Sequence, residues 1–558
     1  MTTSRNFENK NDYSCIPLVN ESYGWKQIPA GKRILFFRGF VHGHSSSSIA
    51  AKASEVTYEE IAPWLNSING HFSIIILGNK WCMAAVDPVR SYPLIWTFDN
   101  KRILVSNNGP DLTRAIGLEH LDIDEHQLDA FALSGFTIGP RTLYKKIHQL
   151  EPGTFITIRE NADYQVSAYH KWNPMRPSQA KLQDLIEPLS LINEKLIDKL
   201  ALSGMGRKII VPLSAGLDSR FIASGLKQAG YKNVWCISYG RRGNREIEVA
   251  REIANKLGYK WDFIEYTNAS VRKALATEDH KSYEEYANCL TSIPFPQDYT
   301  ALAELRASGR LDPDSIIVNG QSGDFTSGNH IPKSLIEPPP ISDKKRLEAV
   351  INALVKKHFK HWPSLLSASR LKIIQDMLKS EIERVGGLPS DPNRDHGLYE
   401  LIEFRDRQAK YVIHGQRLYE YMGLSWRLPL WERESLDFWE KAPLEAKANQ
   451  NLYKQVLIRD NWGGVWKDIP INPSNIRPIW LYIVRLMAKL IHAPIGVNKW
   501  HNFERRYLNY WMSPLCSYAE WPYSKVVREG SNAHGAIALH IKKYLDSSAG
   551  NNSIWLSK

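Results

Sequence analysis

The sequence predicts an α/β protein: a β-rich N-terminal part, then a parallel sheet with crossover helices, then a helical part. In the first ~170 residues, short apolar runs such as 72–77 and 103–105 are separated by turn residues, which indicates strands. From Pro188 the apolar residues recur at helical spacing, and strands then alternate with helices. After about residue 340 the chain is rich in Trp and Arg and has a mostly helical pattern.

The alternating part defines the predicted sheet. Pro188 suits the first turn of a helix whose apolar positions are Leu189, Ile192, Leu196 and Leu200. The elements expected after it are strand 209–213, helix 220–229, strand 234–238, helix 246–257 and strands 262–266 and 315–318. Strands separated by helices form parallel sheets, because a crossover must return the chain to the same edge.

Length and composition indicate a globular protein of two or three domains. The chain has 558 residues, 43% of them hydrophobic and 11% aromatic. Its five cysteines are scattered without a CxxC pair, which argues for a reducing compartment and against a zinc site. The first residues are polar, and no apolar run reaches the ~18–20 residues of a spanning helix. We therefore expect a cytoplasmic protein.

The net charge is +12, and the pI is about 9.2. Such an excess is compatible with nucleic acid, an anionic membrane surface, anionic small substrates or simply a solvated basic surface. The sequence has no long Lys/Arg block with interleaved aromatic residues. We expect no nucleic-acid partner.

The stretch LSAGLDSRF, residues 213–221, follows a predicted strand and opens a predicted helix. Ligand sites of parallel sheets lie at the carboxyl ends of the strands, and a helix N-terminus there favours an anion. Small residues allow a phosphate to approach the backbone, and Asp218 could reach a Mg²⁺ held against it. The alternative is an ordinary strand–turn–helix junction capped by Ser and Asp.

A second stretch of the same kind is SIIVNGQSGDFTSGNH, residues 315–330. It is a strand followed by a Gly-rich turn, with Asp324 shortly after the end of the strand. Two Asp residues at the ends of two parallel strands can share divalent metal ions bound to a triphosphate or pyrophosphate. The pair favours the phosphate interpretation of both stretches.

Together these stretches resemble the asparagine synthetase family, whose synthetase domain belongs to the PP-loop ATP pyrophosphatases. Residues 214–219 match its SGGxDS loop, and 320–325 look like its GEGxDE element with changes at 321, 322 and 325. Ser238, Gly240 and the helix after them match the element between these two. Further likenesses are at 427–432, to an Arg-x-Pro-Phe-Leu-Asp element, and at 70–72, 87–94 and 142–153 in the N-terminal part.

The resemblance implies a fold, cofactors and roles. It implies an α/β/β/α glutaminase-like (Ntn-hydrolase-like) domain over 1–175, a doubly wound parallel PP-loop ATP-binding domain over 176–530, and a tail over 531–558. The implied cofactors are ATP and Mg²⁺, with Asp218 and Asp324 on the metal. Lys454 would meet the activated intermediate, although a surface lysine is the alternative. The nucleotide-binding residues implied are Leu213, Ser214, Gly216, Leu217, Asp218, Ser219, Ser238, Gly240, Gly320 and Gly323.

The N-terminal part departs from the family pattern at the glutaminase site. Members that hydrolyse glutamine carry Cys after the initiator Met, where its freed amine acts as base. Here residue 2 is Thr, and Cys15 reads as an ordinary packed cysteine. Arg38 replaces the Asn whose amide stabilises the oxyanion. We expect a non-hydrolysing domain.

The synthetase part departs at two positions. Gln321 replaces a Glu near the family's reaction centre, and Phe325 replaces the Glu after the second Asp. A neutral amide at 321 is no strong base, which indicates a different acceptor from that of asparagine synthetase. Beta-lactam synthetases and lasso-peptide cyclases, in the same family, also lack glutaminase activity and alter this position.

The expected reaction is the formation of an amide by an asparagine synthetase-like carbon–nitrogen ligase. A carboxylate of a small molecule, glycan or peptide would be adenylated, with release of pyrophosphate, and passed to ammonia or an amine. Asparagine biosynthesis, sugar-acid amidation for a surface polysaccharide, and lactam or peptide cyclisation of a specialised metabolite all remain open. The alternative is a catalytically silent scaffold that binds nucleotide or sugar. A homodimer is one option for the assembly.

Residues 476–495, IRPIWLYIVRLMAKLIHAPI, form a separate candidate. Arg485, Lys489 and His492 recur at i, i+4 and i+7 and make a cationic stripe on an apolar helix. Such a helix can lie in a membrane interface, which would make the protein membrane-associated. The alternative is a core helix whose basic residues extend to solvent.

Overall fold

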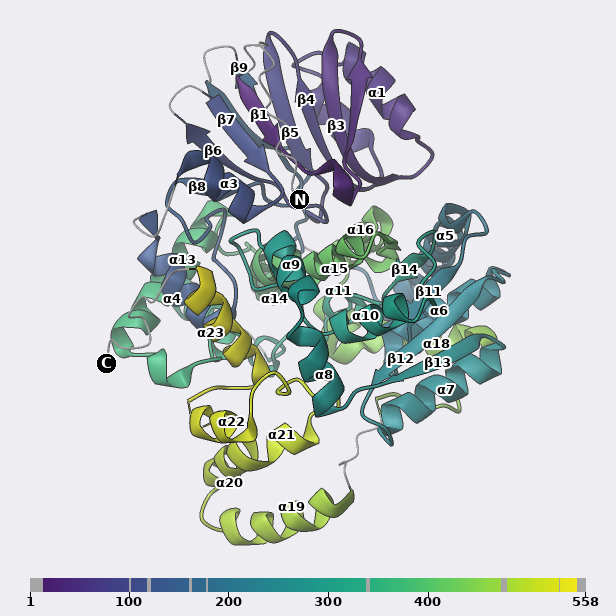
Figure 1. The fold of residues 1–558 in the computed structure, drawn as a ribbon, viewed down its shortest axis with the longest axis vertical. Helices are drawn as coiled ribbons and strands as arrows, with labels where there is room; N and C mark the ends of the chain where they lie inside the picture. Colours follow the sequence, from purple (N-terminus) through teal and green to yellow (C-terminus); the bar gives the residue numbers. More distant parts are fainter. Residues whose placement is uncertain are drawn as a thin grey trace. The chain divides into compact units, whose positions relative to one another are not determined.

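The computed structural model describes residues 14–99, 102–117, 122–159, 163–176, 179–337, 342–472, 479–530 and 532–548 (Figure 1). The chain divides into two compact units. Unit 1 consists of residues 1–119 and 146–171, and unit 2 of residues 120–145 and 172–558.

Unit 1 is a sandwich of two sheets. The larger has the strand order β10-β9-β5-β4-β3-β2 and the smaller β1-β7-β6-β8 (Figure 1). Side chains from both sheets, such as Phe36, Ile75 and Val105, share one core. Its strands are β1 (Cys15–Leu18), β2 (Lys26–Ala30), β3 (Arg33–Val41), β4 (Gly70–Leu77), β5 (Trp81–Val86), β6 (Ile95–Asp99), β7 (Arg102–Ser106), β8 (Ile147–Gln149), β9 (Thr154–Arg159) and β10 (Tyr164–Ala168).

Helices cover the outer faces of this sandwich. Helices α1 (Ser46–Glu55) and α2 (Ile61–Ser67) pack on the larger sheet through Ile49, Ala53 and Leu65. Helix α3 (Gly109–Ile116) lies against β6 and β7 of the smaller one. The expected α/β/β/α arrangement is confirmed.

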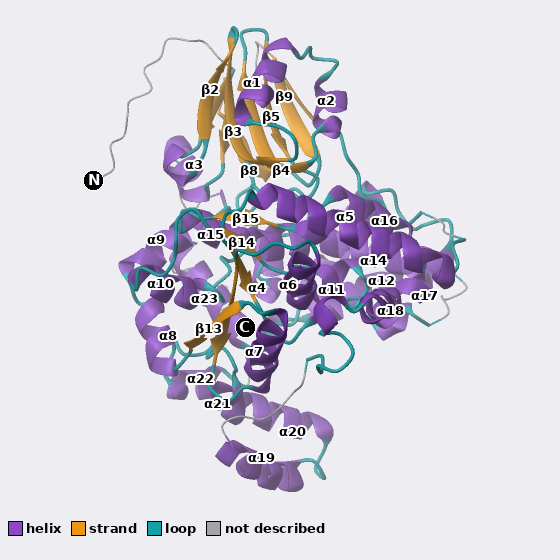
Figure 2. Ribbon diagram, turned by 90° about the vertical axis from the view of Figure 1, so that its right-hand side faces the viewer, coloured by secondary structure: helices purple, strands orange, loops and turns teal. Residues whose placement is uncertain are grey.

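Unit 2 is built on a five-stranded parallel sheet of order β13-β12-β11-β14-β15. Its strands are β11 (Ile209–Pro212), β12 (Val234–Gly240), β13 (Lys260–Glu265), β14 (Ile316–Val318) and β15 (Ser425–Arg427). Figure 2 shows α6 (Leu217–Gln228) and α7 (Arg245–Leu257) on one side of the strands and α8 (Asn268–Leu275) and α10 (Tyr299–Ala307) on the other. The doubly wound parallel sheet is therefore confirmed.

The helix after β11 begins three residues earlier than predicted. Leu217 is its first residue, and Gly216 precedes it with extended backbone. Asp218 and Ser219 therefore belong to the first turn of α6, where the free backbone N–H groups of a helix lie. The predicted helix at Pro188 is α5 (Ile186–Gly204), with Leu189, Leu196 and Leu200 buried.

The rest of unit 2 is helical. Its further helices are α4 (Glu125–Ser134), α9 (Glu278–Ala287), α11 (Gly323–Thr326), α12 (Asp343–His358), α13 (Ala368–Arg384), α14 (Asp395–Glu403), α15 (Arg417–Tyr421), α16 (Arg433–Lys441), α17 (Leu444–Lys447), α18 (Asn451–Asp460), α19 (Ile479–His492), α20 (Val497–Phe503), α21 (Asn509–Met512), α22 (Tyr523–Glu529) and α23 (Ala536–Ser548), with a π-helical stretch at Phe404–Val412. Among the described residues, no helix combines the length and the apolar content that crossing a bilayer requires.

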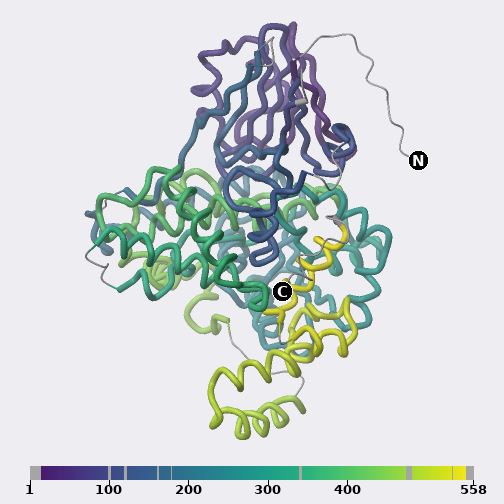
Figure 3. The backbone as a smooth tube through the Cα atoms, turned by 90° about the vertical axis from the view of Figure 1, so that its left-hand side faces the viewer, coloured from purple at the N-terminus to yellow at the C-terminus, as the bar shows by residue number. Residues whose placement is uncertain are grey.

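Two segments group with unit 2 in the structure. Residues 120–145 belong to unit 2 and run among its elements (Figure 3). The backbone N–H of Gly139, for example, donates to Asp406 Oδ1 over 2.9 Å. The stretch 531–558 contains α23, whose Leu539 lies in one apolar core with Leu133 and Trp362. The boundaries at 175 and 530 remain predictions.

Buried histidines of unit 2 predict a pH-dependent stability. Burial and the charges of Lys543 and His540 lower the pKa of His280 to about 3, and burial lowers the pKa of His540 to about 4. A depressed folded-state pKa stabilises the fold above about pH 6.5, and this stability is lost as the pH falls toward 3–4. Each histidine is expected to remove about 1.4 kcal/mol of unfolding free energy per pH unit in that window.

His280→Gln is therefore expected to flatten the dependence. Denaturant unfolding of the wild type and this variant at about pH 7 and about pH 5 measures the change. An equal loss of stability in both proteins would contradict the role given to His280.

Candidate active site

Asp218 lies in the first turn of α6, directly after the turn that ends β11. That turn is held by its own serines: Ser214 N donates to Ser219 Oγ over 3.0 Å, and the two hydroxyl oxygens are also 3.0 Å apart. The N–H of Gly216 donates to Ser214 Oγ over 3.2 Å. Ser214 is exposed, so the turn presents its hydroxyl and the helix N-terminus to a ligand.

The structure shows why a basic residue, Arg220, follows the acidic turn. Its guanidinium is buried and donates to four backbone carbonyl groups, those of Ala215, Val465, Ile469 and Pro470, over 2.7–3.1 Å. Burial lowers the pKa of Arg220 to about 10, which leaves it protonated at neutral pH. Arg220 thus ties the turn to the segment after α18 and is no substrate ligand in this arrangement.

The second loop follows β14, which is the parallel neighbour of β11. It packs so closely on α6 that a Cβ at either of two of its glycines would lie under 3 Å from an atom of α6. A Cβ at Gly320 would lie 2.5 Å from Ser219 N, and a Cβ at Gly323 would lie 2.6 Å from Asp218 Oδ1. This approach lets Asp324 N donate to Asp218 Oδ2 over 2.9 Å. The two predicted acids therefore meet at the carboxyl edge of the sheet.

The two carboxyl groups differ in their tendency to ionise. Burial and the neighbouring charge of Asp324 raise the pKa of Asp218 well above its ordinary value. Burial alone would raise the pKa of Asp324 too, but hydrogen bonding and charge from His330 outweigh it, so that pKa is lowered. Burial and the Asp218 carboxylate also raise the pKa of Tyr453 well above its usual value. Ionisation is therefore favoured at Asp324 and disfavoured at Asp218.

The acidic pair fits a divalent cation shared with a phosphate. Asp218 Oδ1 is a buried oxygen that makes no hydrogen bond of ordinary geometry with the described residues, although the Tyr453 hydroxyl interacts with this carboxyl group. A buried oxygen normally has a hydrogen-bond partner. The side chain of Asp324 is 43% exposed, so a ligand can reach it. No group of three or more His, Cys, Asp or Glu in the described part of the chain forms a metal site by itself. A Mg²⁺ held by the two carboxylates would take its further ligands from phosphate oxygens and water.

A network of hydrogen-bonded side chains lies next to Asp324, and the sequence did not predict it. His330 Nε2 lies 3.2 Å from Asp324 Oδ2, and its Nδ1 lies 2.5 Å from Glu403 Oε1. Glu403 also lies 3.3 Å from His358 Nε2 and accepts from Gln408 Nε2 over 3.1 Å. His330 is only six residues from Asp324, but Glu403 is 73 residues further along, so no local pattern could indicate the pair.

Burial alone would raise the pKa of Glu403, yet the charges of His358 and His330 lower it well below its usual value. Burial lowers the pKa of His330, but the charge of Glu403 and the hydrogen bonds to Asp324 and Glu403 raise it above its ordinary value. His330 therefore lies between two carboxyl groups that favour its protonated form, and its contact with Asp324 orients that side chain.

The remaining predicted residues lie around the two loops. Gln321 Oε1 accepts from Gln416 Nε2 over 3.0 Å, so the amide at 321 is held by another amide. Phe325 is fully buried and stacks on Trp431 with ring centroids 5.8 Å apart. Position 325 therefore points into the protein core and not into the acidic pair.

Other residues predicted to bind the nucleotide make hydrogen bonds between strands or pack in the core. Leu213 N donates to Ile237 O over 2.8 Å, and Ser238 Oγ donates to Leu213 O over 2.7 Å. The side chains of Leu213 and Leu217 lie in the core between the sheet and its helices. Gly240 has a φ of +142°, and a Cβ there would lie 3.0 Å from Pro514 O. Their roles in ligand binding remain predictions.

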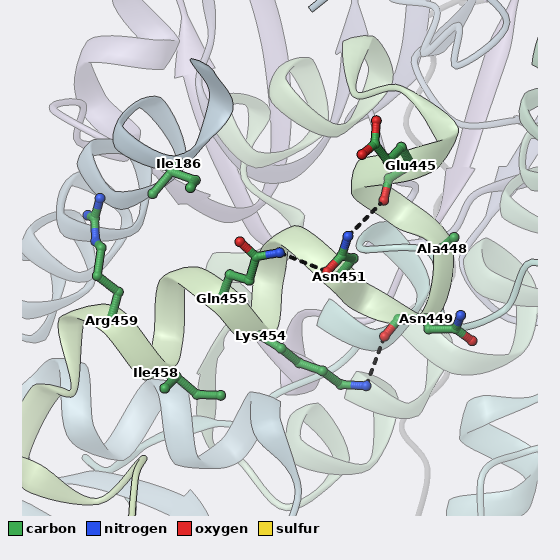
Figure 4. Close-up of a pocket in the computed structure, with 9 residues that line it drawn as sticks. All are labelled: Ile186, Glu445, Ala448, Asn449, Asn451, Lys454, Gln455, Ile458 and Arg459. Carbon is green, nitrogen blue, oxygen red and sulfur yellow. Dashed lines mark hydrogen bonds between the residues drawn. The ribbon is translucent and has the colours of Figure 1, made fainter. Parts of the chain in front are cut away.

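Lys454 lies in the second turn of α18 and lines a different hollow from the acidic loops. Its Nζ donates to Asn449 O over 2.8 Å (Figure 4). The hollow has a volume of about 800 Å³ and is also lined by Asn451, Gln455 and Arg459. The ammonium group donates to a backbone carbonyl here, and its contact with an intermediate remains a prediction.

The predicted loss of the glutaminase groups can be followed in unit 1. Cys15 lies in β1 and is 1% exposed, and burial raises the pKa of its thiol well above the usual value. Arg38 donates to Gly24 O over 3.3 Å, with its guanidinium 5.3 Å from the ring centre of Tyr92. Thr2 lies outside the described residues.

Comparison with known proteins gives a partial likeness. No family model matches the chain. Over 228 residues it is 25% identical to asparagine synthetase [glutamine-hydrolyzing] 1 of Bacillus subtilis (strain 168), which covers 40% of this chain and 34% of that protein. The chain therefore spans about a third of the length of this curated relative. The likeness points to a distant, ligase-type relative.

Two solved structures are also similar in part. One is glutamine phosphoribosylpyrophosphate (PRPP) amidotransferase from B. subtilis complexed with ADP and GMP, at 9% identity over 53% of this chain and 63% of that one, with a TM-score of 0.19. The other, an allosteric regulatory enzyme of purine biosynthesis, is 11% identical over 43% of this chain and 62% of that one, with a TM-score of 0.19. Similarity at this level carries no argument about fold or function.

Proposed function

We propose that the protein is an ATP-dependent ligase that forms an amide through an acyl-adenylate. A substrate carboxylate attacks the α-phosphate of ATP and releases pyrophosphate, and ammonia or an amine then displaces AMP from the acyl group. The observation that carries this proposal is the meeting of Asp218 and Asp324 at the ends of β11 and β14. The partial likeness to an asparagine synthetase supports it.

Each part of the site has a role in this proposal. Ser214, Gly216 and Ser219, with the N-terminus of α6, bind the departing pyrophosphate. Asp218 and Asp324 hold Mg²⁺, which would neutralise charge on the phosphates when bound. Gly320 and Gly323 let the second loop reach the first. Lys454 swings from Asn449 to stabilise charge in one or both steps.

The source of nitrogen in this proposal is free ammonia or an amine substrate. A buried thiol of raised pKa, such as that of Cys15, is a poor nucleophile, because the thiolate is the reactive form. Arg38 supplies no amide for an oxyanion. We therefore assign no glutamine hydrolysis to unit 1. The acid substrate is a small-molecule, glycan or peptide carboxylate, with a surface-polysaccharide or specialised-metabolite product.

Exchange of labelled pyrophosphate into ATP tests this function. The purified chain would be incubated with ATP, Mg²⁺ and a panel of acids that includes aspartate, a uronic acid and N-blocked peptides. We expect exchange that depends on one class of acid and is abolished by EDTA. Binding of ATP without exchange for any acid would instead favour a silent nucleotide-binding scaffold.

A further inference from the structure

The most apolar surface of the described chain lies on α19 and the turn after it. Ten of the eighteen large apolar side chains that are exposed among the described residues fall between positions 480 and 497. They are 44–65% exposed and comprise Trp480, Tyr482, Ile483, Val484, Leu486, Met487, Leu490, Ile491, Ile495 and Val497. We call them the apolar face.

Two of the three basic residues of the predicted cationic stripe contact neighbouring elements of unit 2. Leu481 and Ala488 are buried and pack with Trp500 of α20. Arg485 lies on the same inner side, in an ion pair with Glu504 and with its guanidinium 5.4 Å from the ring centre of Trp500. His492 stacks on Phe503 with centroids 4.3 Å apart. Arg485 and His492 therefore contact α20 and the residue after it, whereas Lys489 of the predicted stripe is exposed.

Apart from a ring contact between Trp480 and Trp511, no described residue covers the apolar face of α19. The helices α19 and α20 lie side by side as a pair (Figure 1, Figure 3). Ten neighbouring large side chains, each about half exposed, expose apolar area on the order of 1,000 Å², against ~300–600 Å² for the largest patch of a typical monomer. Such a surface indicates a docking site.

The charges around the apolar face favour an anionic partner. Between residues 469 and 519 the sequence has six Lys or Arg and only one acid, Glu504. That acid is already bound to Arg485. Lys489 and Lys499, which are exposed, lie at and beyond the border of the apolar face. Anionic lipid headgroups would neutralise these two lysines.

We propose that the apolar face of α19 inserts into the headgroup region of an anionic lipid bilayer. Its 14 residues rise about 21 Å, less than the ~30 Å of hydrocarbon, so the helix lies along the surface. Ile483, Leu486 and Leu490 enter the acyl boundary, and Lys489 and Lys499 meet the phosphates. Trp480 and Tyr482, at the start of the helix, suit the interface because one end of each ring is polar. This inference is independent of the reaction proposed above.

Co-sedimentation with vesicles tests the proposal on the full chain. The vesicles are phosphatidylcholine alone or phosphatidylcholine with phosphatidylglycerol. We expect binding to the anionic vesicles that weakens with added salt, and a loss of at least about tenfold in partitioning for the Ile483→Glu/Leu490→Glu variant. Leu202→Glu is the matched control, because Leu202 is a 77% exposed leucine on α5, and its partitioning should stay at the wild-type level.

Site-specific labelling tests the same contact without a charge change. All five native cysteines are buried, so a cysteine introduced at position 483 can be labelled selectively with a polarity-sensitive dye. The fluorescence of a dye at Ile483→Cys should rise with anionic vesicles, and that of a dye at Leu202→Cys should not. Absence of binding to anionic vesicles would overturn the proposal. So would a dimer in light scattering that Ile483→Glu/Leu490→Glu dissociates, since a second copy would then cover this face.

Discussion

Replacement of Asp218 by alanine is expected to abolish carboxylate-dependent exchange of labelled pyrophosphate into ATP. The variant lacks Asp218 Oδ1, the buried oxygen proposed to bind the metal ion. It also lacks one of the two carboxyl groups of the acidic pair. Loss of more than about a hundredfold is expected, since even outer-shell changes at metal sites cost 10–100-fold. Exchange assays with increasing Mg²⁺ measure the effect and show whether metal affinity is what changed.

The fold is expected to survive this change. Burial and the charge of Asp324 raise the pKa of Asp218, so its ionisation as the pH rises costs folded-state stability. The variant has no such cost, and at neutral pH its unfolding free energy should be close to that of the wild type or above it. The loss of one hydrogen bond from Asp324 N costs about 1 kcal/mol in the opposite direction. Undiminished exchange in a folded Asp218→Ala protein would refute the ligase assignment.

The sheet and the acidic pair were accessible from sequence because both depend on local patterns. β11 and β14 are short apolar runs, and each is followed by a turn with small residues that contains Asp218 or Asp324. Adjacent parallel strands bring their carboxyl ends together, so their turns must meet.

Contacts between distant segments could not be predicted in this way. Glu403 reaches His330 through the packing of α14, and Arg220 binds carbonyl groups about 250 residues away. The orientation of α19 follows the same rule. The sequence pattern of α19 predicted a basic and an apolar side of the helix. It could not predict that Arg485 forms an ion pair with Glu504, on the segment after α20. Sequence periodicity defines the faces of a helix, and its partners decide which one is buried.

Gly320→Ala is expected to disrupt the acidic pair without touching any charged group. The added Cβ would lie 2.5 Å from Ser219 N and 2.6 Å from Asp218 C, both backbone atoms of α6 that cannot rotate away. Either α6 or the second loop has to move, and overpacking of this kind costs about 1–3 kcal/mol. We expect ATP binding, measured by calorimetry, to fall with the unfolding free energy.

Two other glycines make this prediction specific. A Cβ at Gly323 would meet Asp218 Oδ1 at 2.6 Å, a side-chain atom that can shift, so Gly323→Ala should weaken metal-dependent binding but cost less stability. At Gly415 the nearest contact would be 3.4 Å, from the Phe295 ring, and Gly415→Ala should leave ATP binding unchanged. Because alanine restricts the unfolded chain more than glycine does, that control should be neutral or slightly stabilising. If Gly320→Ala bound ATP as tightly as the Gly415→Ala control, close approach of the two loops would not be required for the site.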